Sequence, residues 1–200
     1  MGILSSNSVI IPAVKTRVKY YGVFDFKQIY RDVRDKLTDL GYIKGEDYKY
    51  IEPYYSERES SDPREGKTIW IWWRTKKIEE GSTYYEQHID LDFHLRFCRD
   101  MEIMVDDVKR RVWKAEIEVL LDTYLLLDPD DKWKNHWFLK TVHPLFYRRI
   151  WRKRREDRKN STMTDAYKVQ AMVKDSFEIA HFMPLKGESF FQPYGYKKNV

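Results

Sequence analysis

The chain has 200 residues, a net charge of +5 and one cysteine, and 34% of its residues are charged while 16% are aromatic. A chain of this length buries roughly 70% of the surface that its unfolded form exposes, so one domain folds without a covalent or metal staple. The lone Cys98 excludes an internal disulfide framework and a cysteine-based zinc site. No apolar run reaches the roughly 18 residues that mark a membrane-spanning helix. No catalytic sequence motif stands out, so we expect a protein that is not an enzyme and needs no cofactor or metal ion.

The first element in chain order is an N-terminal arm, residues 1–19, with an edge strand near Val14–Tyr21. No basic segment precedes its apolar stretch, and Pro12 interrupts that stretch, so it does not resemble a secretory signal peptide. We therefore expect a protein of the cytoplasm or of a virus particle.

Residues 25–40 carry a helical pattern. Asp25 can cap the helix, and Gln28 stands three residues later, as in a capping box. Gly41 supplies a stop signal. One apolar stripe recurs at helical spacing and is made of Phe26, Ile29, Tyr30, Val33, Leu37 and Leu40.

The pattern in the middle of the chain predicts strands. Residues 42–54 predict a short strand, and residues 55–66 a polar loop. Residues 68–78 alternate, with Ile69, Ile71 and Trp73 on one face and Trp70 and Trp72 on the other.

Residues 84–97 and 112–127 also alternate, which predicts half-buried strands with one wet face. Residues 101–105 predict a short return strand between them. The buried face of the first long strand is expected to carry Tyr85, Ile89, Leu91, Phe93, Leu95 and Phe97.

The pattern in the C-terminal half predicts helices. Residues 128–131 open a helix that is expected to help cover the sheet, with a kink or a new start at Pro144. Its apolar stripe, which would be buried against the sheet, comprises Trp133, Trp137, Phe138, Leu145, Phe146 and Ile150. Residues 156–163 are expected to break it, and Thr164 to cap a last helix that ends near Ala180.

These elements predict an α+β fold, with an antiparallel meander sheet of about four strands covered by helices and a helical C-terminal half. We expect a single domain over residues 20–180, followed by an aromatic tail over residues 181–200.

Basic residues are concentrated in one segment. Residues 147–159 hold eight basic and two acidic residues, so the segment carries +6 and the rest of the chain about −1. Arginine binds phosphate bidentately and stacks on bases, which favours a nucleic-acid or acidic-protein contact over a merely solvated helix end. The candidate contact residues are Arg148, Arg149, Trp151, Arg152, Lys153, Arg154, Arg155 and Arg158.

Large aromatic rings on both faces of residues 68–78 require cover on both faces. The second face is either buried by the same chain or is a surface for association with another chain. The candidate association surface comprises Trp70, Trp72, Phe190, Phe191 and Tyr194.

The polar row His88, Asp90, Asp92 and His94 looks like a metal site, but alternate strand residues lie about 6.8 Å apart, too far to share one ion. A wet strand face is the better interpretation. If the protein were an enzyme, Asp90, Asp92 and His94 would be the first candidates.

The sequence YYGVFDF at residues 20–26 leads into a helix, and alternating strands and a late helix with KVQ at residues 168–170 follow. In this order the features resemble a family of small, uncharacterised proteins from archaeal and viral genomes. The resemblance covers roughly residues 20–180, implies a helix, a meander sheet and further helices, and brings no activity or catalytic residue.

We therefore expect a non-enzymatic interaction subunit of a larger assembly, such as a component of a virus particle, that associates with protein partners or with itself. The alternative is a nucleic-acid-binding protein that uses residues 147–159.

Overall fold

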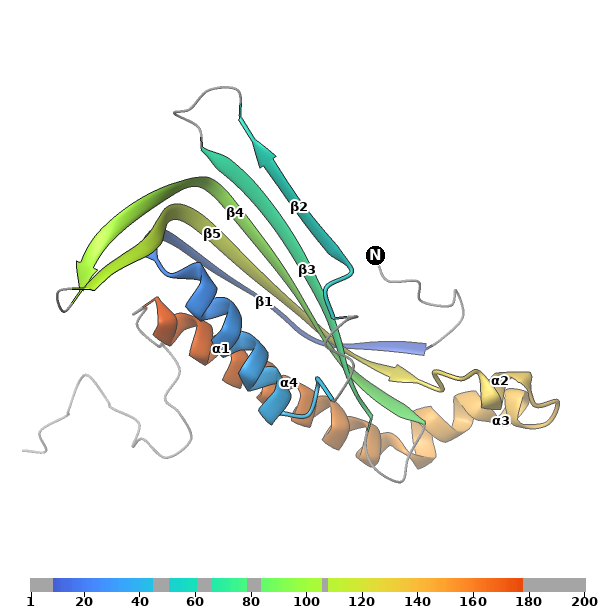
Figure 1. Ribbon diagram of the computed structural model, residues 1–200. Coiled ribbons are helices and arrows are strands. Elements are labelled where there is room, and N and C mark those ends of the chain that lie inside the picture. Colours follow the sequence, from blue (N-terminus) through green and yellow to red (C-terminus); the bar gives the residue numbers. More distant parts are fainter. Residues whose placement is uncertain (1–8, 45–50, 61–65, 79–83, 106–107, 178–200) are drawn as a thin grey trace, which may run out of the picture.

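The computed structural model describes residues 9–44, 51–60, 66–78, 84–105 and 108–177. Five antiparallel strands form one sheet in the order β1-β5-β4-β3-β2, and helices α1 and α4 lie along one face of it (Figure 1). The α+β class, the antiparallel pairing and the helical C-terminal part are thereby confirmed. The elements are β1 (Val9–Phe24), α1 (Phe26–Asp39), β2 (Tyr54–Glu59), β3 (Lys67–Ile78), β4 (Tyr85–Val105), β5 (Val108–Leu127), α2 (Lys132–Asn135), α3 (Leu139–Leu145), the π-helix η2 (Phe146–Ile150) and α4 (Arg152–Ser176).

The sheet has five strands, so the expected number of about four is wrong. The edge strand expected near Val14–Tyr21 is the longer strand β1, which pairs with β5 from Val9 to Phe24. Strand β2 lies where a polar loop was expected. Its side chains are mostly exposed and it is held by its pairing with β3, so no apolar alternation marks it in the sequence.

Strand β4 contains a bulge that the alternation did not reveal. Phe97 has a positive φ of 57°, and the register with β5 shifts between Arg96 and Arg99. The bulge reverses the two faces, so Phe97 is exposed and Cys98 is buried in its place. The expectation that Phe97 is buried is therefore wrong, and residues 101–105 continue β4 instead of forming a separate return strand.

The core lies between the sheet and the two helices. Four residues of the expected stripe of α1 are buried, namely Phe26, Ile29, Val33 and Leu37, and Tyr30 and Leu40 are partly buried against the same core. At the start of α1, Asp25 Oδ1 accepts a hydrogen bond from Gln28 N at 3.1 Å. Trp73 is fully buried on β3. The other sheet residues in this core include Ile69, Ile71, Ile89, Leu91, Phe93, Leu95, Ile117, Val119 and Leu121.

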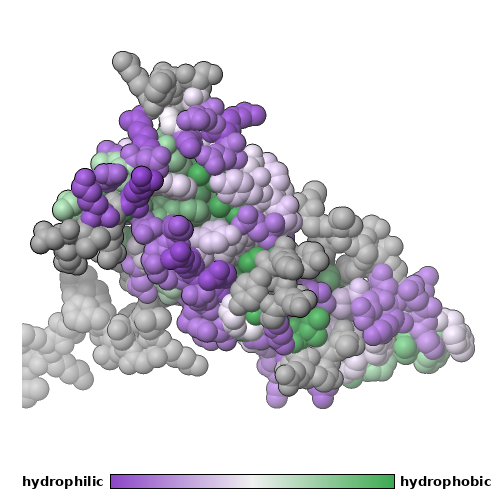
Figure 2. All heavy atoms as spheres, viewed as in Figure 1, coloured by the Kyte–Doolittle hydropathy of each residue, from purple (hydrophilic) through white to green (hydrophobic). Residues whose placement is uncertain are grey.

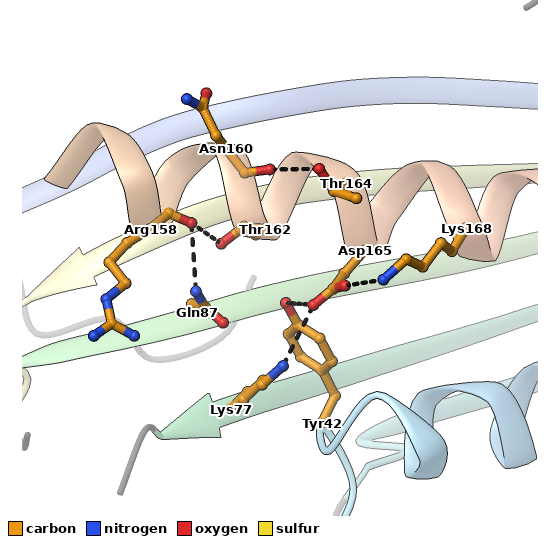
Figure 3. Close-up of polar contacts among 9 residues, drawn as sticks. All are labelled: Tyr42, Lys77, Gln87, Arg158, Asn160, Thr162, Thr164, Asp165 and Lys168. Carbon is orange, nitrogen blue, oxygen red and sulfur yellow. Dashed lines mark hydrogen bonds and ion pairs between the residues drawn. The ribbon is translucent and has the colours of Figure 1, made fainter. Parts of the chain in front are cut away.

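Helix α4 runs for 25 residues without a break, so the expected interruption at 156–163 is wrong. The segment contains no proline or glycine. The Thr162 and Thr164 hydroxyls donate to the carbonyl oxygens of Arg158 and Asn160, four residues earlier, at 3.0 and 2.9 Å (Figure 3). Polar side chains are thus compatible with a continuous helix here.

Two polar contacts attach the middle of α4 to the sheet (Figure 3). Gln87 Nε2 on β4 donates to the Arg158 carbonyl oxygen at 3.3 Å. The buried Asp165 carboxylate accepts from Tyr42 Oη and Lys77 Nζ, both at 3.4 Å, and from Lys168 Nζ at 3.1 Å. These contacts set the position of the first half of α4, which carries the basic segment.

No described helix covers the opposite face of the sheet, and ion pairs cross it between neighbouring strands. Lys15 Nζ lies 2.9 Å from Asp122, and Arg17 Nη1 lies 3.0 Å from Glu118. The alternation of the long strands into one apolar and one wet face is thus confirmed for residues 88–96 and 114–124. It does not hold where β4 begins and β5 ends, because residues 84–87 and 125–127 are all buried. In the part of the chain that the structure describes, no helix has the length and apolar character needed to cross a bilayer.

Candidate interaction surfaces

Beyond β5 the chain leaves the sheet and forms a projecting end (Figure 1). Asp128 N donates to Tyr84 O at 2.9 Å, and Asp128 Oδ2 accepts from Trp133 N at the start of α2. Helix α2 has only four residues and ends at Asn135. The long helix expected to run from residues 128–131 through Trp137 and Phe138 is therefore interrupted.

A cluster of aromatic rings joins this end to the sheet. Tyr84 Oη lies 2.6 Å from His143 Nε2, and both side chains are buried. The Tyr84 ring also packs edge-to-face on Trp151 and Trp133, with ring centroids 5.0 and 5.6 Å apart. Burial lowers the pKa of His143 and raises the pKa of Tyr84, so both groups are neutral at neutral pH.

The outer surface of the same end carries apolar side chains in contact with solvent. Trp137 is 84% exposed, and Phe138, Leu145 and Ile150 are 55%, 48% and 57% exposed. These four residues were expected in one buried stripe, and that expectation is wrong. The short α2 separates Trp133 from Trp137, so that only the former packs inward.

The basic segment contains exposed and partly buried side chains. Arg155 Nη1 donates to the Tyr147 carbonyl oxygen at 3.2 Å, and its Nη2 pairs with Glu156 at 2.6 Å, which lowers the pKa of Glu156. Trp151 packs in the aromatic cluster. Arg158 is partly buried, and its backbone carbonyl oxygen accepts from Gln87. The exposed members are Arg148, Arg149, Arg152, Lys153 and Arg154.

One signal in the sequence marks this surface more widely than residues 147–159. Residues 132–155 contain nine lysines and arginines and no aspartate or glutamate, together with three tryptophans. We call this stretch the basic aromatic end. In Figure 2 hydrophobic and hydrophilic residues lie next to each other at the end of the molecule where Figure 1 places α2 and α3. Counting acidic residues over a window wider than residues 147–159 would have identified this stretch in the sequence.

Trp70 and Trp72 lie on the uncovered sheet face. Trp70 is 41% exposed and stacks on His94 with ring centroids 3.7 Å apart. Trp72 is half-buried between Tyr54, at 4.3 Å, and the Arg74 guanidinium, at 5.6 Å. The other expected members of this surface, Phe190, Phe191 and Tyr194, lie outside the described residues.

The polar centre of the uncovered face holds two carboxylates around one guanidinium. Arg74 Nη1 lies 2.6 Å from Asp92 Oδ1, and Arg74 Nε lies 3.4 Å from Asp90 Oδ2. Burial raises the pKa of Asp90 to about 6, although Arg74 opposes the shift. Burial lowers the pKa of His94. Within the described ranges, no three histidine, cysteine or carboxylate side chains come together as metal ligands.

No protein-family model matches this chain, and no curated protein is significantly similar to it. A solved structure titled delta-endotoxin is similar at a TM-score of 0.35 and 10% sequence identity, over 61% of each chain. The present chain therefore spans about three-fifths of that protein. A TM-score this low carries no argument about fold or function, and the resemblance to the archaeal and viral family stays a prediction.

Proposed function

We propose that this protein is an interaction subunit of a larger assembly and that it attaches through the basic aromatic end. The observation that supports this most strongly is the exposure of four large apolar side chains in this stretch, Trp137, Phe138, Leu145 and Ile150. Exposed aromatic patches with neighbouring arginines have the composition of binding hot spots. The location of the assembly, in the cytoplasm or in a virus particle, is part of the proposal.

The proposed attachment fits the way in which the end is built. One side of α3 and η2 packs on Tyr84 through His143 and Tyr147, while the other side carries the exposed apolar residues. The contact surface is therefore held on the domain by a buried hydrogen bond and aromatic packing. Such preorganisation lowers the entropy that binding costs.

The test is the sedimentation of the full chain in extract from the cells that naturally produce it. We expect the wild type to sediment with a large complex and a Trp137→Ser/Phe138→Ser double variant to sediment as a free chain. Tyr21→Ser is the matched control, because Tyr21 is exposed on the sheet, away from this end. A wild type that sediments alone, or a double variant that stays in the complex, would contradict the proposal.

A second candidate function is nucleic-acid binding through the same segment. It is favoured by the five exposed cations Arg148, Arg149, Arg152, Lys153 and Arg154, which form no ion pair with any described carboxylate. Binding would then weaken steeply with salt, because each neutralised phosphate releases counterions. Replacing Arg148, Arg149, Arg152 and Arg154 with glutamate should abolish binding to single- or double-stranded DNA; unchanged binding would reject this function.

A further inference from the structure

We propose that the partner of the basic aromatic end is an anionic lipid bilayer, on whose surface the protein lies without crossing it. Trp137 and Phe138 would enter the headgroup region, and the exposed guanidinium groups would bind lipid phosphates. This inference rests on the proposed function, because it names the partner of the same surface.

The exposed side chains have the chemistry of an interfacial anchor. Tryptophan and phenylalanine concentrate at the boundary between headgroups and acyl chains, and leucine and isoleucine extend the apolar contact. The ring centroids of Trp137 and Phe138 lie 5.7 Å apart, and both side chains are exposed. Nucleic acid would stack on the rings but would leave Leu145 and Ile150 without apolar cover, so these two residues favour lipid.

Helical spacing places the apolar residues in one row. Phe138 has helical backbone angles at the start of α3, and Leu145 follows seven residues later, on the same side of the helix. The next turn is widened, with Trp151 N donating to Phe146 O at 2.8 Å, five residues apart. Ile150 follows Leu145 by five residues and therefore continues the row across this turn.

The opposite side of the same helices is already occupied. His143 is hydrogen-bonded to Tyr84, and Trp151 packs on Trp133 with centroids 5.3 Å apart. A helix that is apolar on two sides needs a second cover. The outer row lies among basic residues in a stretch without any acidic residue. A complementary partner therefore offers both an apolar region and negative charges, as the acyl chains and headgroups of an anionic bilayer do.

The cations predict how strongly binding depends on lipid charge. A lysine or arginine near an anionic leaflet increases the partition coefficient about fivefold, which corresponds to about 1 kcal/mol. Replacing both Arg148 and Arg149 with glutamine should therefore weaken binding about 25-fold. Removing both rings at Trp137 and Phe138 should weaken binding by at least about tenfold, because each ring loses its apolar contact.

The experiment is co-sedimentation of the full chain with vesicles of phosphatidylcholine alone or mixed with phosphatidylglycerol. The variants are Trp137→Ala/Phe138→Ala and Arg148→Gln/Arg149→Gln. The matched charge control is Lys109→Gln/Arg111→Gln, because both residues are exposed on β5 near its hairpin with β4, at the opposite end of the sheet. Circular dichroism verifies that each variant is folded.

We expect the wild type and the control to bind only the anionic vesicles. Binding of the arginine variant should be weaker by about 25-fold, and binding of the Trp137→Ala/Phe138→Ala variant by at least about tenfold. Binding that survives Trp137→Ala/Phe138→Ala overturns the inference, since it would be electrostatic attraction alone. A wild type that sediments with a protein complex but binds no vesicle overturns the lipid partner and leaves the proposed function standing. A wild type that binds DNA but no vesicle also overturns the lipid partner and supports the second candidate function. A wild type that binds no vesicle and sediments alone in cell extract contradicts both the lipid partner and the proposed function.

Discussion

Asp165 is the residue whose replacement tests most sharply how α4 is held on the sheet. Its carboxylate is buried and accepts from Tyr42 on the segment after α1, Lys77 on β3 and Lys168 on α4 itself (Figure 3). Asp165→Ala removes all three acceptor contacts at once. It leaves the apolar contacts of the neighbouring Ala166 and Val169 in place.

The expected cost follows from what remains buried. Tyr42 is only 2% exposed, and a buried hydroxyl that loses its acceptor costs about 1–3 kcal/mol. Lys77 is about one-third exposed and is partly rehydrated, so its lost ion pair adds at most about 1 kcal/mol. We therefore expect Asp165→Ala to lower the free energy of unfolding by about 1–4 kcal/mol. Asp165→Asn should cost less, because the amide oxygen still accepts from Tyr42.

The assay is urea unfolding followed by far-ultraviolet circular dichroism, with equal slopes for the compared variants. Lys168→Ala is the matched control, because Lys168 is half exposed and its pair with Asp165 lies within one helix. The control should cost less than about 0.5 kcal/mol. An Asp165→Ala variant as stable as Lys168→Ala would refute the reasoning.

Three further predictions concern stability. Asp90→Asn should raise the free energy of unfolding at neutral pH by about 1–2 kcal/mol, because burial raises the pKa of Asp90 to about 6. This gain should vanish below the ordinary carboxyl pKa, where Asp90 is protonated in both the folded and the unfolded state. A lower free energy of unfolding for Asp90→Asn at neutral pH, measured in urea, would contradict this. NMR titration should give His143 a pKa below its ordinary value, so the unfolded state takes up the proton first and acid destabilises the fold. Tyr84→Phe should lower the free energy of unfolding by about 1–2 kcal/mol. An unchanged urea midpoint for this variant would argue against the hydrogen bond between Tyr84 and His143. Trp73→Ala should cost about 3–5 kcal/mol and Trp70→Ala less than about 1 kcal/mol in the same assay; similar costs would mean that the sheet faces are wrongly assigned.

Sequence periodicity predicted the elements whose burial is one-sided. The stripe of α1 and the alternation of β3, β4 and β5 all have a period that a single apolar face imposes. Strand β2 could not be found in this way, because it is held by its backbone pairing with β3 and has exposed side chains. The bulge at Phe97 also escaped, because the shift of register depends on its pairing with β5.

The candidate surface was predicted only in part. The basic segment was visible in the sequence, but Trp137, Phe138, Leu145 and Ile150 were placed in a buried stripe. Periodicity reports that a side chain is apolar and regularly spaced, and it does not report which partner covers it. The short α2 and the widened turn of η2 decide which apolar residues face Tyr84 and which face solvent. Those features depend on contacts between segments far apart in the chain.

Hydrogen–deuterium exchange of the full chain, with and without anionic vesicles, tests the basic aromatic end most directly. We predict that peptides covering residues 132–155 become protected and that peptides of the uncovered sheet face around Trp70 do not. Protection around Trp70 with none in residues 132–155 would contradict the account.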